Sequence, residues 1–125
     1  MSNDELISKA YEAMKNSYAP YSKFNVGAVA LCGEKIYIGC NIEMHLSAQL
    51  YVLKDVLFFK AVSDGCTKID KIVIVCSTHD FAYPCGICRQ VMTEFMDENG
   101  IIVVTNDKEI REYKLSDLMP ESFRM

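Results

Sequence analysis

The apolar positions near the start of the chain recur at helical spacing. Asn3 stands before two acidic residues, Asp4 and Glu5, as at the N-terminus of many helices. The apolar residues that follow lie mostly three or four positions apart and mark one helix face: Leu6, Ile7, Ala10, Tyr11 and Met14. The pattern predicts an amphipathic helix over residues 3–16, ended by turn residues 19–22.

Several later segments carry the short apolar runs that are typical of β-strands. The predicted strands are residues 24–31, 35–40, 69–76, 101–105 and a weak strand near Tyr113. The first two flank Gly33-Glu34 and therefore predict a hairpin. The third is a short run that is apolar from Ile72 to Cys76, as in a buried strand. A turn is expected at residues 116–119.

Two further segments predict helices. Ser47 can cap a helix over residues 48–63, and Gly65 is placed to end it. This segment is apolar almost without interruption, so its helix must be buried on most sides. Another helix is predicted from Cys85 to about Met96. Helices and strands in this order are typical of a three-layer α/β domain.

Length and composition narrow the class of protein. With 125 residues, half of them apolar, the chain can bury one core, so we expect a single domain over residues 1–125. The net charge of -4, with basic residues scattered, argues against nucleic-acid binding. Neither a membrane span nor an export signal is visible, which favours a cytoplasmic protein. The six cysteines are then expected to be reduced thiols.

One short segment contains two cysteines at a spacing that is typical of metal ligands. Residues 84–90 read Pro-Cys-Gly-Ile-Cys-Arg-Gln and contain Cys85 and Cys88. Zinc deaminases combine a Pro-Cys-x-x-Cys loop with an earlier His or Cys ligand, which stands two residues before a proton-shuttling Glu. This chain contains the second part of that signature only.

Five segments together give the chain a resemblance to a known family. They are residues 19–28, 39–43, 59–65, 84–90 and 118–120 with Phe123. In these segments the chain resembles the small cytidine deaminases, zinc enzymes that hydrolyse cytidine or deoxycytidine to the uridine form. The resemblance implies a three-layer α-β-α fold with a five-stranded mixed sheet. It also implies a homotetramer whose pockets include residues of neighbouring chains.

The resemblance further implies roles for individual residues. Phe24 would pack near the pyrimidine, Asn41 and Glu43 would hydrogen-bond the ribose hydroxyl, and Cys85 and Cys88 would bind zinc. Without the resemblance, Phe24 is equally well a core residue of its strand, and Asn41 and Glu43 are loop residues with solvated side chains. Their place in intact family motifs is what favours binding of a nucleoside-like ligand.

The upstream zinc motif is replaced in this chain. The family places Cys-Ala-Glu at the start of the buried helix, so that the Cys binds zinc and the Glu faces the metal-bound water. Counting forward from Asn41 or backward from residues 59–62 puts Val52-Leu53-Lys54 at these positions. A slip of one residue would bring Asp55 to the Glu position. It would also turn the helix by about 100° and require compensating insertions, so we reject it.

The replacements predict a site with no zinc and no deaminase activity. A catalytic zinc needs three protein ligands and an open position for water, and Val52 leaves only Cys85 and Cys88. Lys54 also brings positive charge to the position of the catalytic carboxylate. We therefore expect no cofactor and a pseudoenzyme that binds a nucleoside-like ligand, with Lys54 among the contacts, or that serves in assembly.

The alternative is a cytidine or deoxycytidine deaminase with an atypical site. His45 is the better candidate for a third zinc ligand and His79 the weaker one, although both are more simply loop or surface histidines. Such an enzyme would also lack the family Glu. It would need Glu43 for proton transfer, which conflicts with a ribose contact by the same residue.

Three other functions stay open. A desolvated Lys54 would serve as a base or Schiff-base nucleophile in different chemistry, although a solvated or Glu43-paired lysine is favoured. Cys85 and Cys88 form a C-x-x-C unit suited to redox chemistry, but the element order differs from that of thioredoxin. The apolar helix over residues 48–62 would serve assembly with copies of the chain or with an active relative.

Overall fold

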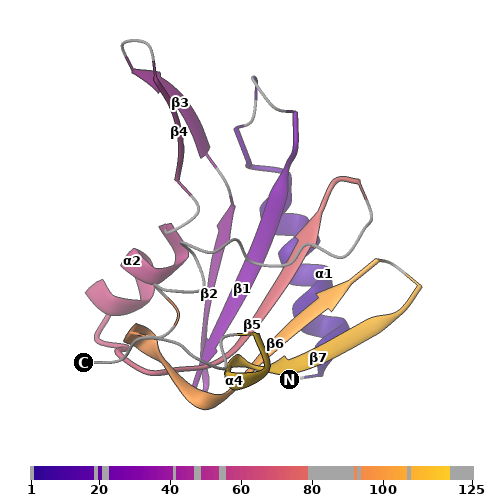
Figure 1. The fold of residues 1–125 in the computed structure, drawn as a ribbon, viewed down its shortest axis with the longest axis vertical. Helices are drawn as coiled ribbons and strands as arrows, with labels where there is room; N and C mark the ends of the chain where they lie inside the picture. The colour runs from indigo at the N-terminus through magenta and orange to yellow at the C-terminus, as the bar shows by residue number, and fades with distance from the viewer. Residues whose placement is uncertain are drawn as a thin grey trace.

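The chain folds around one large sheet that has helices on both faces (Figure 1). The computed structural model describes residues 2–18, 20, 23–40, 42–46, 49–53, 56–78, 92, 94–106 and 108–118. In chain order the elements are α1 (Asn3–Met14), β1 (Val26–Cys32), β2 (Lys35–Cys40), β3 (Ile42–Leu46), β4 (Gln49–Leu53), α2 (Val56–Ser63), β5 (Ile69–Cys76), β6 (Met96–Thr105), β7 (Ile110–Lys114) and α4 (Leu115–Leu118).

The large sheet has five strands in the order β2-β1-β5-β6-β7. β1 pairs antiparallel with β2 and with β5, β5 and β6 run parallel, and β7 is antiparallel to β6. The predicted α/β fold with a five-stranded mixed sheet is therefore confirmed. The weak strand expected near Tyr113 is the edge strand β7.

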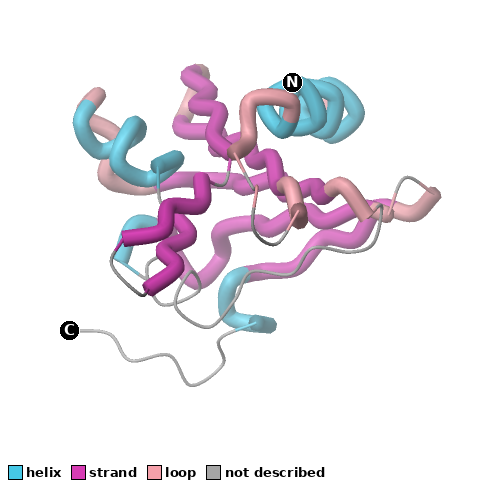
Figure 2. The backbone as a smooth tube through the Cα atoms, turned by 90° about the horizontal axis from the view of Figure 1, so that it is seen from above, coloured by secondary structure: helices cyan, strands magenta, loops and turns pink. Residues whose placement is uncertain are grey.

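Two apolar cores lie on opposite faces of this sheet. Alternate residues of β5 belong to different cores, Ile74 to one and Val75 to the other, which explains why the strand is apolar from Ile72 to Cys76. Leu57 of α2 and Leu115 of α4 are buried in the first core, and Leu6 of α1 is buried in the second. Figure 2 shows α1 on one side of the sheet and α2 and α4 on the other.

α1 rests directly on the backbone of β1. A Cβ atom at Gly27 would lie 2.0 Å from the Ala10 carbonyl oxygen and 2.8 Å from the Met14 backbone nitrogen. Only a residue without a side chain permits this approach. The helix begins at Asn3, as predicted, and the Ser2 hydroxyl caps it by accepting a hydrogen bond from the Glu5 N–H at 3.2 Å.

The segment predicted as a helix over residues 48–63 folds differently. Among its described residues, only Val56–Ser63 is helical, whereas Gln49–Leu53 forms β4, which pairs with β3 in a separate two-stranded hairpin. A continuous apolar run does not by itself distinguish helix from strand. The alternating residues of Ile42–Leu46 supply the neighbouring strand that makes pairing favourable. Figure 1 shows the hairpin extending beyond the end of the large sheet.

Other differences concern element boundaries. The helix predicted over residues 85–96 falls mainly outside the described residues, although Glu94 and Phe95 are helical. β6 begins earlier than the predicted strand 101–105, and the turn predicted at residues 116–119 is the short helix α4. Within the described ranges, no helix is long and apolar enough to cross a membrane.

A disulfide joins Cys32, the last residue of β1, to Cys66, which follows α2. The prediction that all six cysteines are reduced is therefore wrong for this pair. That prediction was based on the expected cytoplasmic location and took no account of the fold, which brings the two cysteines together. Cys40 and Cys76 are not part of a disulfide. The bridged residues are 34 apart, and the chain-entropy model assigns a loop of this size about 4 kcal/mol of stabilisation.

Asp64 links the end of α2 to β2. The Tyr37 hydroxyl donates to Asp64 Oδ2 at 2.6 Å, and Lys35 Nζ lies 3.4 Å from the same oxygen. The Tyr37 hydrogen bond and then Lys35 lower the pKa of the Asp64 carboxyl. The carboxylate form is thus favoured in the folded state. Its contribution to stability is complete above about pH 4 and is lost as the pH falls below that value.

Replacing Gly27 with Ala is expected to lower the free energy of unfolding by about 3 kcal/mol, because the new methyl group must push α1 away from β1. Urea denaturation followed by circular dichroism measures the change. Gly33→Ala is the matched control, since a Cβ there meets nothing within 4 Å and the φ of +61° costs only about 1 kcal/mol. Equal effects of the two substitutions would contradict the close approach at Gly27.

Tyr37→Phe is expected to raise the pKa of Asp64 toward its ordinary value, because the substitution removes the hydrogen bond that is the largest cause of the shift. Lys35→Met is expected to raise the same pKa by less. NMR titration of the Asp64 carboxyl carbon in both variants measures the two shifts. A larger rise in Lys35→Met than in Tyr37→Phe would show that charge, rather than the hydrogen bond, controls this carboxyl.

Candidate functional site

At one end of the large sheet, three of its strands begin or finish side by side (Figure 1). β1 begins at this end, where β2 and β5 finish: Val26 pairs with Cys76, and Gly27 pairs with Cys40. The residues before β1, after β2 and after β5 therefore connect to the sheet at one place. In the sequence, these three segments carry Phe24, Asn41, and the pair Cys85 and Cys88.

Hydrogen bonds hold the start of β1 against the end of β5. The Ser77 N–H donates to the Asn25 carbonyl oxygen at 2.8 Å, and the Asn25 N–H donates to Ser77 Oγ at 3.1 Å. The Ser17 hydroxyl donates to Asn25 Oδ1 at 2.9 Å. Asn25 thereby fixes the backbone next to Phe24. The sequence analysis missed this role, and its only signal was a polar residue at the beginning of an apolar strand.

Phe24 is half-buried and packs against the core that α2 covers. The residue before it, Lys23, has a φ of 60°. This left-handed conformation costs about 1–2 kcal/mol for a residue with a side chain, and such residues cluster at binding and catalytic sites. The packing agrees with a core role for Phe24. Contact with a pyrimidine stays a prediction.

The β3–β4 hairpin contains several of the predicted site positions. Glu43 is opposite Val52 and His45 is opposite Leu50 in the antiparallel register. Opposed residues share a face of a sheet, as do residues two apart along a strand. Positions 43, 45, 50 and 52 therefore occupy one face of the hairpin, and Leu53 is on the other. The prediction that Val52 and Leu53 begin the buried helix is wrong, because β4 pairs with β3.

α2 is fastened to β2 beside this region. Lys60 Nζ donates to the Ile38 carbonyl oxygen at 2.8 Å. Leu57 lies against Gly39, where a Cβ atom would be 3.1 Å from Leu57 Cβ. Burial raises the pKa of the Cys40 thiol, and the positive charge of Lys60 partly offsets that rise. Because its thiol stays protonated at neutral pH, Cys40 is a poor nucleophile.

Several predicted site residues lie outside the described residues. They are Asn41, Lys54, Asp55, His79, Cys85 and Cys88. Their roles stay predictions. Among the residues that the structure does describe, no three His, Cys, Asp or Glu side chains form a group that could hold a metal ion.

Comparisons with known proteins relate the chain to enzymes of one kind. Residues 1–105 match the model of the cytidine and deoxycytidylate deaminase zinc-binding region. The chain is 38% identical to the cytidine deaminase of Sporosarcina psychrophila, over 98% of this chain and 92% of that protein. It is 34% identical to the cytidine deaminase of Halalkalibacterium halodurans, over 98% of this chain and 95% of that protein.

Solved structures of cytidine deaminases share the fold. The enzyme from Burkholderia pseudomallei superposes with a TM-score of 0.88 at 33% identity, over 98% of this chain and all of that chain (100%). The enzyme from Mycobacterium tuberculosis superposes with a TM-score of 0.84 at 28% identity, over 100% of this chain and 99% of that chain. The similarity thus extends through the whole fold rather than through the cysteine loop alone.

These findings correct two predictions. Relatives similar over nearly the whole chain are named cytidine deaminase, which contradicts the interpretation as a pseudoenzyme. The matched family region is a zinc-binding region, which contradicts the expected absence of a cofactor. Both predictions rested on the lack of a zinc-binding atom at Val52 and on Lys54 in place of the catalytic carboxylate. In the observed hairpin, Glu43 of β3 is opposite Val52, and position 45 is on the same face.

The fold and the matches agree with each other along the length of the chain. Solved cytidine deaminases share this fold. In this chain the fold has a five-stranded sheet covered on both faces, with the ends of β2 and β5 beside the start of β1. The family model covers residues 1–105, and several named relatives are more than 30% identical over nearly the entire chain. The chain therefore belongs to the cytidine deaminase family.

Proposed function

We propose that this protein deaminates cytidine or deoxycytidine by hydrolysis at an atypical zinc site. The observation that carries the proposal is the 38% identity over 98% of the chain to a protein named cytidine deaminase. The ends of β2 and β5 beside the start of β1 support it, because ligands of α/β proteins bind where strands end and loops begin.

The donor chemistry of the chain fits zinc. Cys85 and Cys88 offer thiolates, which zinc binds readily. Val52 has no donor atom, so the third ligand must come from another position. We assign it to His45, which occupies the same hairpin face as Val52 by the register of β3 and β4. When bound, zinc lowers the pKa of its water to about 7 and so supplies hydroxide at neutral pH.

Glu43 is assigned the proton transfer. Hydrolytic deamination needs a carboxylate that accepts a proton from water and delivers it to the base and the leaving ammonia. Lys54 cannot do so as an ammonium, whereas Glu43 is the residue directly opposite Val52 in the hairpin. The ribose hydroxyl is then left to Asn41, and the base to Phe24. Lys54 remains a proposed ligand contact.

A small-molecule ligand fits this family. Assembly into a homotetramer, a cytoplasmic location and a single domain over residues 1–125 stay predictions. Light scattering after size-exclusion chromatography tests the first of these, since a tetramer has four times the mass of the 14.2 kDa chain.

The purified protein is expected to contain about one zinc per chain and to release ammonia from cytidine. His45→Ala is expected to lose both properties, because it removes the assigned third ligand. Metal analysis and a deamination assay on one sample measure them. His79→Ala is the matched control and should keep both. Wild-type protein with neither zinc nor turnover would overturn the proposal.

A further variant tests whether the scaffold accepts zinc at all. The triple substitution Val52→Cys, Leu53→Ala and Lys54→Glu restores the family pattern and should bind zinc tightly if the cysteine loop is intact. If this variant binds zinc and the wild type does not, the assignment of His45 as the third zinc ligand is wrong. Zinc in neither would show that Cys85 and Cys88 do not form a metal site.

Glu43→Gln is expected to lower kcat by about 10²–10⁴ with little change in KM or zinc content, because the amide cannot accept the proton. Steady-state kinetics with cytidine measure both constants. Asn41→Ala is the comparison and should chiefly raise KM through loss of the ribose contact. If Glu43→Gln instead raises KM and spares kcat, Glu43 binds ribose and another group transfers the proton.

A further inference from the structure

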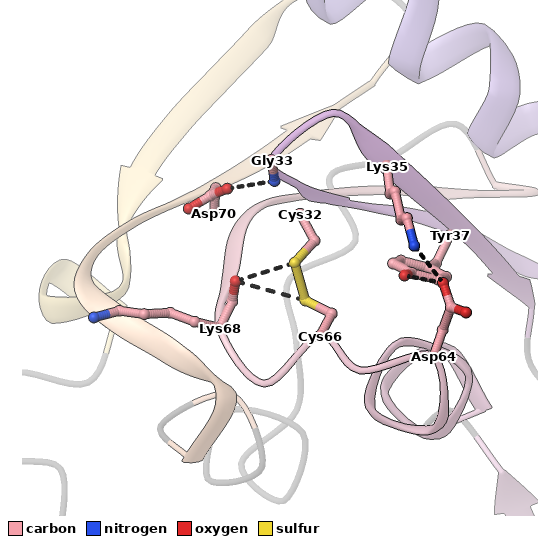
Figure 3. The surroundings of a disulfide bond; sticks show 8 residues. All are labelled: Cys32, Gly33, Lys35, Tyr37, Asp64, Cys66, Lys68 and Asp70. Atoms are coloured by element: carbon pink, nitrogen blue, oxygen red, sulfur yellow. Dashed lines mark hydrogen bonds and ion pairs between the residues drawn. A yellow bond between two sulfur atoms is a disulfide. The ribbon is translucent and has the colours of Figure 1, made fainter.

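The Cys32–Cys66 bridge is the one covalent link between distant segments among the described residues (Figure 3). Cys32 ends β1 immediately before the turn to β2, and Cys66 follows the last turn of α2. Cys32 is half-buried, whereas Cys66 is 6% exposed. An attacking thiolate therefore reaches the Cys32 sulfur more easily than the Cys66 sulfur.

The bridge closes a loop that contains every residue from 33 to 65. This loop comprises β2, the β3–β4 hairpin and α2. It carries the candidate site residues Asn41, Glu43, His45 and Lys54, and also Val52. The hairpin pairs with no strand of the large sheet, so its position depends on how firmly the two ends of this loop are held.

The surroundings of the bridge suit both redox states. The Lys68 carbonyl oxygen lies 3.4 Å from Cys32 Sγ and 3.6 Å from Cys66 Sγ (Figure 3). In the disulfide neither sulfur carries a hydrogen, so these are contacts only. After reduction each sulfur carries a hydrogen that the same carbonyl can accept. The dithiol thus has an acceptor in place with no rearrangement of the backbone.

Non-covalent contacts hold both ends of the loop independently of the bridge. The Gly33 N–H donates to Asp70 Oδ2 at 2.9 Å next to Cys32. The Cys66 N–H donates to the Ala61 carbonyl oxygen at 2.8 Å, a C-terminal cap made possible by the φ of +95° at Gly65. Reduction therefore loosens the loop without releasing its ends, and the sheet itself stays formed.

We propose that Cys32 and Cys66 form a reversible thiol–disulfide site that controls how firmly the β3–β4 hairpin and α2 are held to the sheet. The partner is a cellular dithiol–disulfide couple. In a protein expected in a reducing compartment, an accessible disulfide of this kind is typical of redox sensing. Any consequence for substrate binding rests on the proposed function, because the loop carries its candidate residues.

The exchange balances with a dithiol as reductant. One thiolate of the dithiol attacks Cys32 Sγ, the bond between the two protein sulfurs breaks, and Cys66 leaves as a thiolate that takes a proton. The second thiol of the reductant then attacks the mixed disulfide and releases Cys32 as a thiol. Two electrons pass to the protein, which gains two S–H groups, while the dithiol becomes a cyclic disulfide.

The test uses full-length protein equilibrated in mixtures of reduced and oxidised dithiothreitol. Alkylation followed by peptide mass spectrometry measures the bridged fraction, and thermal melting measures stability without any ligand. Reduction is expected to be reversible and to lower Tm by about 10 °C. Amide hydrogen exchange should quicken within the β3–β4 hairpin and α2, with β5 and β6 unchanged. Because no ligand is present, the outcome of these measurements does not depend on the deaminase proposal.

Cysteine variants supply the controls. Cys32→Ser and Cys66→Ser should each melt at the Tm of reduced wild type and should not respond to the dithiol. Cys40→Ser, whose thiol lies within the loop but outside the bridge, should keep the wild-type response. The proposal is overturned if Cys32 and Cys66 stay unpaired in oxidised dithiothreitol. It is equally overturned if the bridge resists reduction in the folded protein, or if exchange quickens uniformly.

Discussion

Burial of both faces of β5 is the constraint on which the rest of the structure depends. Its residues alternate between two cores, so the sheet must carry α1 on one face and α2 with α4 on the other. Covering the α1 face brings that helix against bare backbone at Gly27. With both faces closed, the ends of the strands are the places left for chemistry. At one of these ends β2 and β5 finish beside the start of β1.

The candidate site combines residues that are anchored to the large sheet with residues of the separate β3–β4 hairpin. Asn25 and Ser77 bind the start of β1 to the end of β5, which positions the backbone beside Phe24. The strands β3 and β4 pair with each other and not with the large sheet. Their mutual register therefore determines which of their residues lie opposite each other. This register sets Glu43 opposite Val52. A replacement in one strand can therefore be compensated by a donor on its neighbour, which a linear motif does not reveal.

The Cys32–Cys66 bridge connects these two parts. It joins the last residue of β1 to Cys66, beyond the end of α2, and the β3–β4 hairpin lies between the two cysteines in the sequence. Chain entropy makes such a link stabilising by about 4 kcal/mol. Tyr37, Lys35 and Asp64 tie the same helix end to β2 without a covalent bond. The C-terminal end of α2 is thus held to the sheet in two independent ways, by the disulfide to β1 and by the polar contacts to β2.

Periodicity alone determined most of the framework. The apolar run of residues 69–76, the turn at Gly33-Glu34 and the amphipathic spacing after Asn3 predicted β5, the first hairpin and α1, because each pattern is local. The motifs around Asn41 and Cys85 pointed to the family for the same reason. The second hairpin, the pairing of Cys32 with Cys66 and the opposition of Glu43 to Val52 were decided only by the tertiary structure. Each depends on which distant segments come to lie side by side, and a continuous apolar run such as residues 50–53 is compatible with helix or strand until a partner strand is present.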